Sequence, residues 1–140
     1  MLDTHIAWRA IRPRGVAGVA LWILAPVDTA ALLFAGIVHF TGARIPLGAT
    51  TFVEPPILPA GIVETAAGLL FALATYAIWR ERAWAWRAAL VAHLFAIAGF
   101  VVGLLATLDG TTPFNALYHR VMLVVFLVGL ALLFIQRSRR

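Results

Sequence analysis

The sequence has no cysteine and no lysine, and charged residues make up only 12% of it. A typical soluble domain has roughly 25% charged residues, so this composition is unusual for such a domain. The absence of cysteine excludes disulfide bonds, thiolate metal sites and a CxxC redox pair. The net charge of +5 does not indicate nucleic-acid binding, because the positive charge is not laid out as a patch on a folded surface.

Long apolar runs take up most of the chain. They are Val16–Phe40, Ile62–Trp79, Trp86–Leu108 and Ala116–Ile135. At 1.5 Å per residue, each run is long enough as a helix to cross a hydrocarbon core of about 30 Å. The runs lack a polar face, which a helix tolerates only among lipid or other helices. We therefore predict one integral membrane domain over residues 1–140. Its fold is all-α, an up-down-up-down bundle with helices at about 16–40, 60–79, 86–108 and 114–135.

The arginines alternate between the two sides of this predicted bundle. Nine of the eleven lie near the two chain termini or near the connection between the second and third runs, which share one side of the bundle. The other two, Arg44 and Arg120, lie toward the opposite side. By the positive-inside rule, both termini should face the cytoplasm of a bacterial inner membrane. Trp79, Trp84 and Trp86 cluster at the second connection, as an aromatic belt at the inner interface requires.

Proline and glycine give finer expectations. Pro26 should kink the first helix, and Asp28 is placed either to cap a broken second half or to bond the backbone groups that Pro26 leaves without a partner. The connection from Thr41 to Ala60 holds four prolines and is predicted to be a long outer loop. The spacing of Gly99 and Gly103 matches a close-packing motif, which we interpret as packing within the chain.

Ionisable side chains at membrane depth are costly unless paired, so each one is a candidate functional residue. Six occur in the apolar runs: Asp28, His39, Glu64, His93, His119 and Arg120. The predicted topology brings His39, Glu64 and His119 to the outer ends of three helices, with Arg120 beside them. We take these four residues as the candidate cofactor-binding set.

Several chemistries fit this set. Two imidazoles and a carboxylate are suitable ligands for zinc, copper or non-haem iron, so His39, Glu64 and His119 form the candidate metal site. The same groups are suited to hydrogen-bonding the carbonyl oxygens of a quinone, and haem is a further option. The simplest alternative is a structural hydrogen-bonded cluster, or contacts to lipid headgroups. No local HxxxH or ExxH spacing supports the metal interpretation.

Asp28 and His93 form a second intramembrane polar set, deeper in the predicted bundle. Asp28 and His39 are eleven residues apart, close to three helical turns, so we expect them on one face with Leu32, Ala35 and Gly36. A proton path through His93, Asp28 and His39 is one interpretation. In the other, His93 bonds a neighbouring backbone carbonyl.

Two segments carry a family resemblance. LLFAGIVHFTGA (Leu32–Ala43), followed by a proline-rich loop and GIVETAAGLLFALATYA (Gly61–Ala77), resembles the DoxX-like group of small four-helix membrane proteins. The likeness covers about the first half to two thirds of the chain. His39 differs from the lysine or arginine that the group has at this place. The resemblance implies a bundle associated with respiratory or redox partners, including quinone-linked thiosulfate oxidation.

From these observations we predict a small accessory or subunit protein of a bacterial membrane redox complex, with other membrane subunits and the lipid bilayer as partners. Its polar site would face a quinone or a metal near the outer leaflet, and the chain is not expected to be an enzyme on its own. One alternative is a stand-alone haem- or metal-binding protein in electron or metal transfer. The other is a purely structural membrane subunit.

Overall fold

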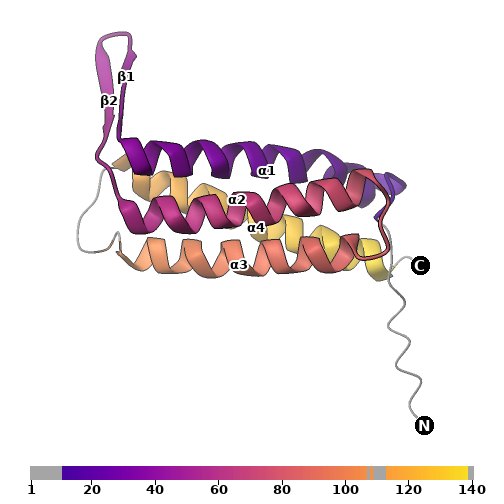
Figure 1. The fold of residues 1–140 in the computed structure, drawn as a ribbon. Helices are drawn as coiled ribbons and strands as arrows, with labels where there is room; N and C mark the ends of the chain where they lie inside the picture. The colour runs from indigo at the N-terminus through magenta and orange to yellow at the C-terminus, as the bar shows by residue number, and fades with distance from the viewer. Residues whose placement is uncertain (1–10, 107, 109–112, 139–140) are drawn as a thin grey trace.

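The computed structural model describes residues 11–106, 108 and 113–138. Four long helices account for most of this chain, and a short β-hairpin follows the first of them (Figure 1). The elements are α1 (Gly15–Thr41), β1 (Ala43–Leu47), β2 (Thr50–Glu54), α2 (Leu58–Trp79), α3 (Ala85–Ala106) and α4 (Pro113–Ser138). The helix ends differ from the predicted ends by at most three residues, which is close to the usual uncertainty of a helix boundary.

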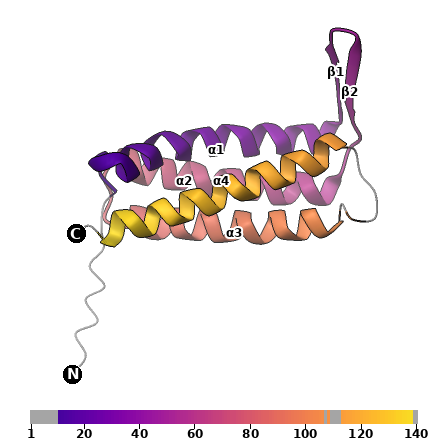
Figure 2. The same ribbon diagram turned by 180° about the vertical axis from the view of Figure 1, so that it is seen from behind.

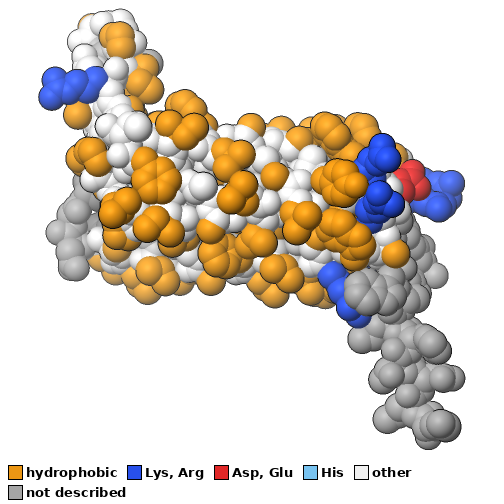
Figure 3. Space-filling view, in the orientation of Figure 1, with side chains coloured by type: hydrophobic (Ala, Val, Ile, Leu, Met, Phe, Trp, Pro, Cys, Tyr) orange, Lys and Arg blue, Asp and Glu red, His pale blue; other side chains and the backbone are white. Residues whose placement is uncertain are grey.

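All four helices are long and apolar enough to cross a membrane. Large hydrophobic side chains are exposed along each of them, including Val16, Leu69, Val102 and Val124. Figure 3 shows that an apolar band without charged side chains covers this face of the bundle. Such a surface is unfavourable in water and favourable against lipid tails, so the chain is a multi-pass membrane protein.

The helices pack as neighbours in chain order, and α4 also contacts α1 (Figures 1 and 2). The beginning of α1 and the end of α4 lie at one end of the bundle, and the hairpin lies at the other. Arginines gather at the end opposite the hairpin, where Figure 3 shows most of the basic side chains of this face. The two ends of the bundle therefore differ in charge.

The hairpin is a feature that the sequence analysis did not predict, since it treated the whole Thr41–Ala60 connection as a loop. Antiparallel strands β1 and β2 pair Ala43 with Glu54 and Leu47 with Thr50. Glycines with positive φ, Gly42 and Gly48, stand before the first strand and at the turn. Pro46 lies within β1, and a proline in a short segment argues against a strand when only the sequence is read. Both strands of a two-stranded sheet are edge strands, where proline is tolerated.

Glycines allow the helices to approach each other closely. A Cβ at Gly36 would collide with Thr65, and one at Gly68 would collide with Leu33, so both glycines set the α1–α2 contact. Gly99 faces Val63 of α2, whereas Gly103 faces His119 of α4. The two glycines of the GxxxG spacing thus pack against two different helices of the same chain, as the sequence analysis interpreted them.

Pro26 does not break α1, which is continuous from Gly15 to Thr41. Asp28 therefore does not cap a second half, and this expectation was wrong. Proline lacks an N–H, so the carbonyl four residues earlier, that of Trp22, loses its helical donor. The indole N–H of Trp79 donates to this carbonyl over 3.2 Å, and the two tryptophan rings lie 5.3 Å apart. An aromatic side chain of α2 thus compensates for the proline in α1.

Candidate functional site

The buried face of α1 carries the candidate residues of that helix. Asp28, Leu32, Ala35, Gly36 and His39 are all buried there, as their spacing predicted. The helical repeat returns residues three, four, seven and eleven positions apart to the same side. This face looks into the bundle, so it directs His39 toward α2 and α4.

His39 and Glu64 form the closest polar contact of the site. The Nδ1 of His39 lies 2.5 Å from Oε2 of Glu64, and both side chains are buried. Each residue is at most 4% exposed, so water does not solvate either group appreciably. The prediction that helices one and two bring these residues together is therefore correct in the structure. Charge-assisted contacts of this length are among the stronger hydrogen bonds in proteins.

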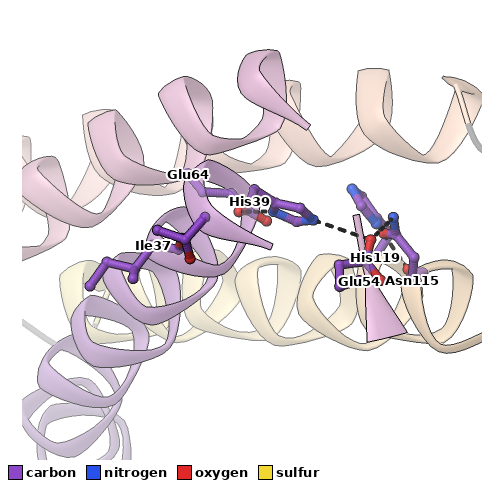
Figure 4. A network of polar contacts seen from close by, with 7 residues as sticks. Ile37, His39, Glu54, Glu64, Asn115 and His119 are labelled. Carbon is purple, nitrogen blue, oxygen red and sulfur yellow. Dashed lines mark hydrogen bonds and ion pairs between the residues drawn. The ribbon is translucent and has the colours of Figure 1, made fainter. Parts of the chain in front are cut away.

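Glu54 is a third member of the site, and it comes from the hairpin. Its Oε1 lies 3.6 Å from Nε2 of His39, and it accepts a hydrogen bond of 3.1 Å from Nδ2 of Asn115 in α4. Figure 4 shows His39 between Glu64 and Glu54, with Asn115 beyond Glu54. The carboxylate at the end of β2 thus joins α1 and α4. Glu54 and Asn115 are buried although they stand in or next to connections.

His119 does not join the His39–Glu64 pair. Its Nδ1 donates to the Asn115 carbonyl over 2.9 Å, its ring packs 5.2 Å from that of Phe100, and Gly103 leaves room for it. Arg120 is exposed on α4. Among the described residues, no three His, Asp or Glu side chains are grouped to hold a metal ion. The proposed ligand set His39, Glu64 and His119 is therefore not assembled, because His119 is directed at α3.

The deeper polar residues are also separate. His93 donates from Nδ1 to the Ala89 carbonyl over 2.7 Å, and its ring contacts Phe71 at 4.9 Å. This agrees with the interpretation in which His93 bonds a neighbouring carbonyl. Asp28 is buried on α1, and Nε2 of His93 has no hydrogen-bond partner in the described part of the chain. The proton path through these residues has no continuous hydrogen-bonded support here.

A pocket of about 320 Å³ adjoins the His39–Glu54 contact. This volume is near the lower end of the range of roughly 300–1,000 Å³ found for small-molecule sites. Its wall is mainly apolar and comes from α1, the hairpin and the start of α4. The lining residues are Ala31, Phe34, Ala35, Val38, His39, Ile45, Phe52, Glu54, Phe114, Asn115 and Tyr118. The pocket thus has a hydrocarbon-like wall, and the polar atoms of His39, Glu54 and Asn115 are turned away from it.

Two polar atoms of this region are buried and have no hydrogen-bond partner among the described residues: Oε1 of Glu64 and the hydroxyl of Tyr118. Tyr118 lies close enough to Glu64 to interact with it through both charge and hydrogen bonding. Buried polar atoms are normally satisfied, and exceptions are enriched at functional sites. These two atoms are therefore placed to satisfy each other beside the pocket.

Sequence reasoning identified His39 and Glu64 but not Glu54 or Asn115 as members of the site. Glu54 is the one acidic residue in the proline-rich connection, and Asn115 follows Pro113 at the start of a helix. Both residues look like ordinary loop or cap positions in the sequence. Their burial depends on the base of the hairpin, where the end of β2 packs against α1 and α4 while the rest of the hairpin projects from the bundle (Figure 1).

Comparison with protein-family models, with curated proteins and with solved structures finds no match for this chain. The likeness to the DoxX-like group stays a prediction from the sequence. The geometry of the site is therefore the ground on which function is argued.

Proposed function

We propose that this chain binds a quinone, or a lipophile of similar shape, in the pocket between α1 and α4, and that it serves as an accessory subunit of a bacterial membrane redox complex. The observation that carries the proposal is an apolar pocket whose wall includes His39 and Glu54, next to the buried contacts of His39 with Glu54 and Glu64. The apolar wall suits the hydrocarbon tail of a quinone.

The cluster is difficult to explain by stability alone. Replacing a buried ion pair with well-packed apolar residues is often neutral or stabilising, so a buried pair is weak support for a purely structural role. Ionisable residues at membrane depth are instead a default indication of a functional site. Here they stand beside a pocket, which is where binding residues are expected.

The arginine distribution supports a direction for the bundle. The connection between α2 and α3 carries Arg80 and Arg82, and Arg87 lies in the first turn of α3, whereas the hairpin carries Arg44. We propose that the hairpin end faces outward, with both termini in the cytoplasm. The pocket then opens near the outer leaflet of the inner membrane, within reach of lipophiles dissolved there.

The small extramembrane part supports an accessory role. Outside the four helices, the described residues form the hairpin and short segments, which are too small to make a catalytic domain. The exposed apolar flanks of the helices suit either lipid or helices of other subunits. Redox chemistry would then be completed by partner subunits.

A pocket-filling substitution tests the binding proposal. Ala31 lines the pocket and neighbouring Ala30 is exposed on the same helix, so Ala31→Phe and Ala30→Phe form a matched pair. We expect a quinone to be extracted from purified wild type and Ala30→Phe, and to be reduced severalfold in Ala31→Phe. Equal quinone content in both variants, or none in wild type, would contradict quinone binding in this pocket.

Purification in mild detergent from native membranes tests the accessory role. We expect redox subunits to copurify with wild type and with Ala31→Phe, because the pocket substitution leaves the outer helix surfaces intact. Copurifying subunits together with an empty pocket would favour the purely structural alternative. Isolation of the chain without partners would oppose the accessory role.

A further inference from the structure

One exposed face of α2 changes in character along the helix. Its residues, spaced by three or four positions, are Leu69, Leu73, Tyr76 and, at the C-cap, Arg80. This spacing places them on the same side of the helix, and all four are exposed. They form the α2 stripe, which passes from apolar through aromatic to basic as the helix approaches its connection to α3.

The length of the α2 stripe matches one leaflet of a bilayer. Leu69 and Arg80 are eleven residues apart, about 16 Å along the axis at 1.5 Å per residue. Half of a hydrocarbon core of about 30 Å thickness is about 15 Å. When Arg80 lies among the headgroups, Leu69 therefore lies near the middle of the membrane. A phospholipid beside α2 thus has its acyl chain against leucines and its headgroup beside an arginine.

Two tryptophans border the α2 stripe on the side of α1. Trp79 of α2 and Trp22 of α1 are both exposed, and their rings lie 5.3 Å apart. The indole N–H of Trp79 donates to the Trp22 carbonyl over 3.2 Å, which holds this ring against α1. Tryptophan is enriched at the membrane interface because its ring is amphipathic. The pair therefore supports the depth assigned to this end of the stripe.

The basic end of the α2 stripe carries an excess of positive charge. Arg82 lies beside it, and its Nη2 donates to the Tyr76 hydroxyl over 3.2 Å. In the described part of the chain, Glu81 is the one acid at this end of the bundle, and Nε of Arg12 pairs with it over 3.0 Å. Figure 3 shows basic side chains gathered here. Because Arg12 offsets the charge of Glu81, the charges of Arg80 and Arg82 are left for an external anion.

We infer that the α2 stripe binds an anionic phospholipid, with its phosphate at Arg80 and Arg82 and an acyl chain along the two leucines. This site is separate from the pocket, which lies at the hairpin end of the bundle. A zwitterionic phospholipid has the same chains and phosphate, but its amine cancels the charge that the arginines attract. A soluble phosphate lacks the chains that lie along α2. The site therefore requires both parts of the lipid.

The experiment uses the full chain purified in mild detergent, with phosphatidylglycerol and phosphatidylcholine of identical acyl chains as probes. Native mass spectrometry measures the Kd of each lipid. We expect phosphatidylglycerol to bind at least about fivefold more tightly, which is the usual contribution of one arginine near an anionic headgroup. An excess of glycerol 3-phosphate should not displace it. Equal Kd values for the two lipids, or displacement by glycerol 3-phosphate, would overturn the inference.

Charge-removing variants locate the site. Arg80→Gln and Arg82→Gln should each weaken phosphatidylglycerol binding about fivefold and leave phosphatidylcholine binding unchanged. Arg137→Gln is the matched control, because Arg137 is exposed at the same end of the bundle but lies over the ring of Trp86 in α3, at 4.6 Å. It should bind phosphatidylglycerol as wild type does. All three arginines are exposed, so each variant should fold.

Two outcomes with these variants would contradict the site. Equal weakening by Arg80→Gln and Arg137→Gln would show that the lipid responds to the total charge of this end and not to the α2 stripe. Unchanged binding in the double variant Arg80→Gln/Arg82→Gln would show that the phosphate lies elsewhere.

Discussion

A carboxylate at membrane depth needs a compensating partner, and Glu64 has one in His39. The two groups contact each other across α1 and α2 while both are nearly inaccessible to solvent. Removing one partner from a buried pair leaves the other with its full desolvation penalty, whereas removing both does not. The energetic role of the pair is thus tested by comparing single and double substitutions.

We predict that His39→Leu destabilises the protein by about 3–5 kcal/mol, because Glu64 is left buried without its partner. The double variant His39→Leu/Glu64→Leu should recover most of this loss. Reversible unfolding in detergent micelles measures both free energies. The prediction fails if the single and double variants are equally stable.

The sequence predicted residues on regular helices better than residues whose position depends on the hairpin. His39 and Glu64 follow from helix register and from the short distance along the chain between the end of α1 and the start of α2. His119 was misassigned because its ring turns toward α3, into the space left by Gly103. A helix with apolar residues on every side does not reveal which neighbouring helix a side chain faces. Glu54 could not be placed because a two-stranded hairpin with a proline carries little strand signal.

At the scale of elements, α3 and α4 each place a histidine ring against a glycine of the other helix. A Cβ at Gly129 would collide with the ring of His93, and a Cβ at Gly103 would collide with the ring of His119. In each helix the glycine follows the histidine by ten residues, about 15 Å along the axis. Both histidines donate to the carbonyl four residues earlier. The antiparallel pair therefore has an approximate internal twofold symmetry that was not recognised in the sequence.

This arrangement predicts coupling between histidine and glycine positions. Gly129→Ala should destabilise the bundle by about 1–3 kcal/mol, because the added methyl group displaces the His93 ring in a packed interface. In a His93→Ala background, the same substitution should have a much smaller effect, since the ring is gone. A double-mutant cycle from unfolding in detergent measures the coupling. Strict additivity would show that the ring does not occupy this space.

The hairpin depends on the bundle for its stability. An isolated two-stranded hairpin is marginally stable, so this one depends on contacts with the bundle. Besides the buried Glu54, the ring of Phe52 packs edge-on against Phe114 of α4 at 4.5 Å. The wall of the pocket on this side is therefore only as rigid as these contacts.

Loss of the aromatic contact should loosen the hairpin. Phe114→Ala is expected to accelerate amide hydrogen exchange in β1 and β2 by about threefold to tenfold, as loss of an aromatic pair implies. Leu117→Ala is the matched control, because Leu117 is similarly exposed on α4, at 58% compared with 55% for Phe114. Equal exchange in the two variants would show that Phe114 does not hold the hairpin.

At the scale of the whole molecule, the sequence predicted the main architecture because lipid solvation leaves few alternatives. A backbone inside a bilayer must satisfy its own hydrogen bonds, so apolar runs of this length form helices. The four spans followed directly from run length. Which helix face looks inward was harder to predict, since lipid and core both accept apolar side chains. Only the ionisable residues and glycines on α1 and α2 gave that information.

The proposed orientation makes one further prediction, which the absence of cysteine makes straightforward to test. Ala49 lies exposed at the hairpin turn, and Ala83 lies exposed in the connection between α2 and α3. In intact cells, a membrane-impermeant thiol reagent should label Ala49→Cys strongly. Ala83→Cys should be labelled only after the membrane is opened, because the arginines around it retain that connection on the cytoplasmic side. The reverse pattern would place the pocket at the inner leaflet, and labelling of both positions in intact cells would mean that the bundle inserts in two orientations.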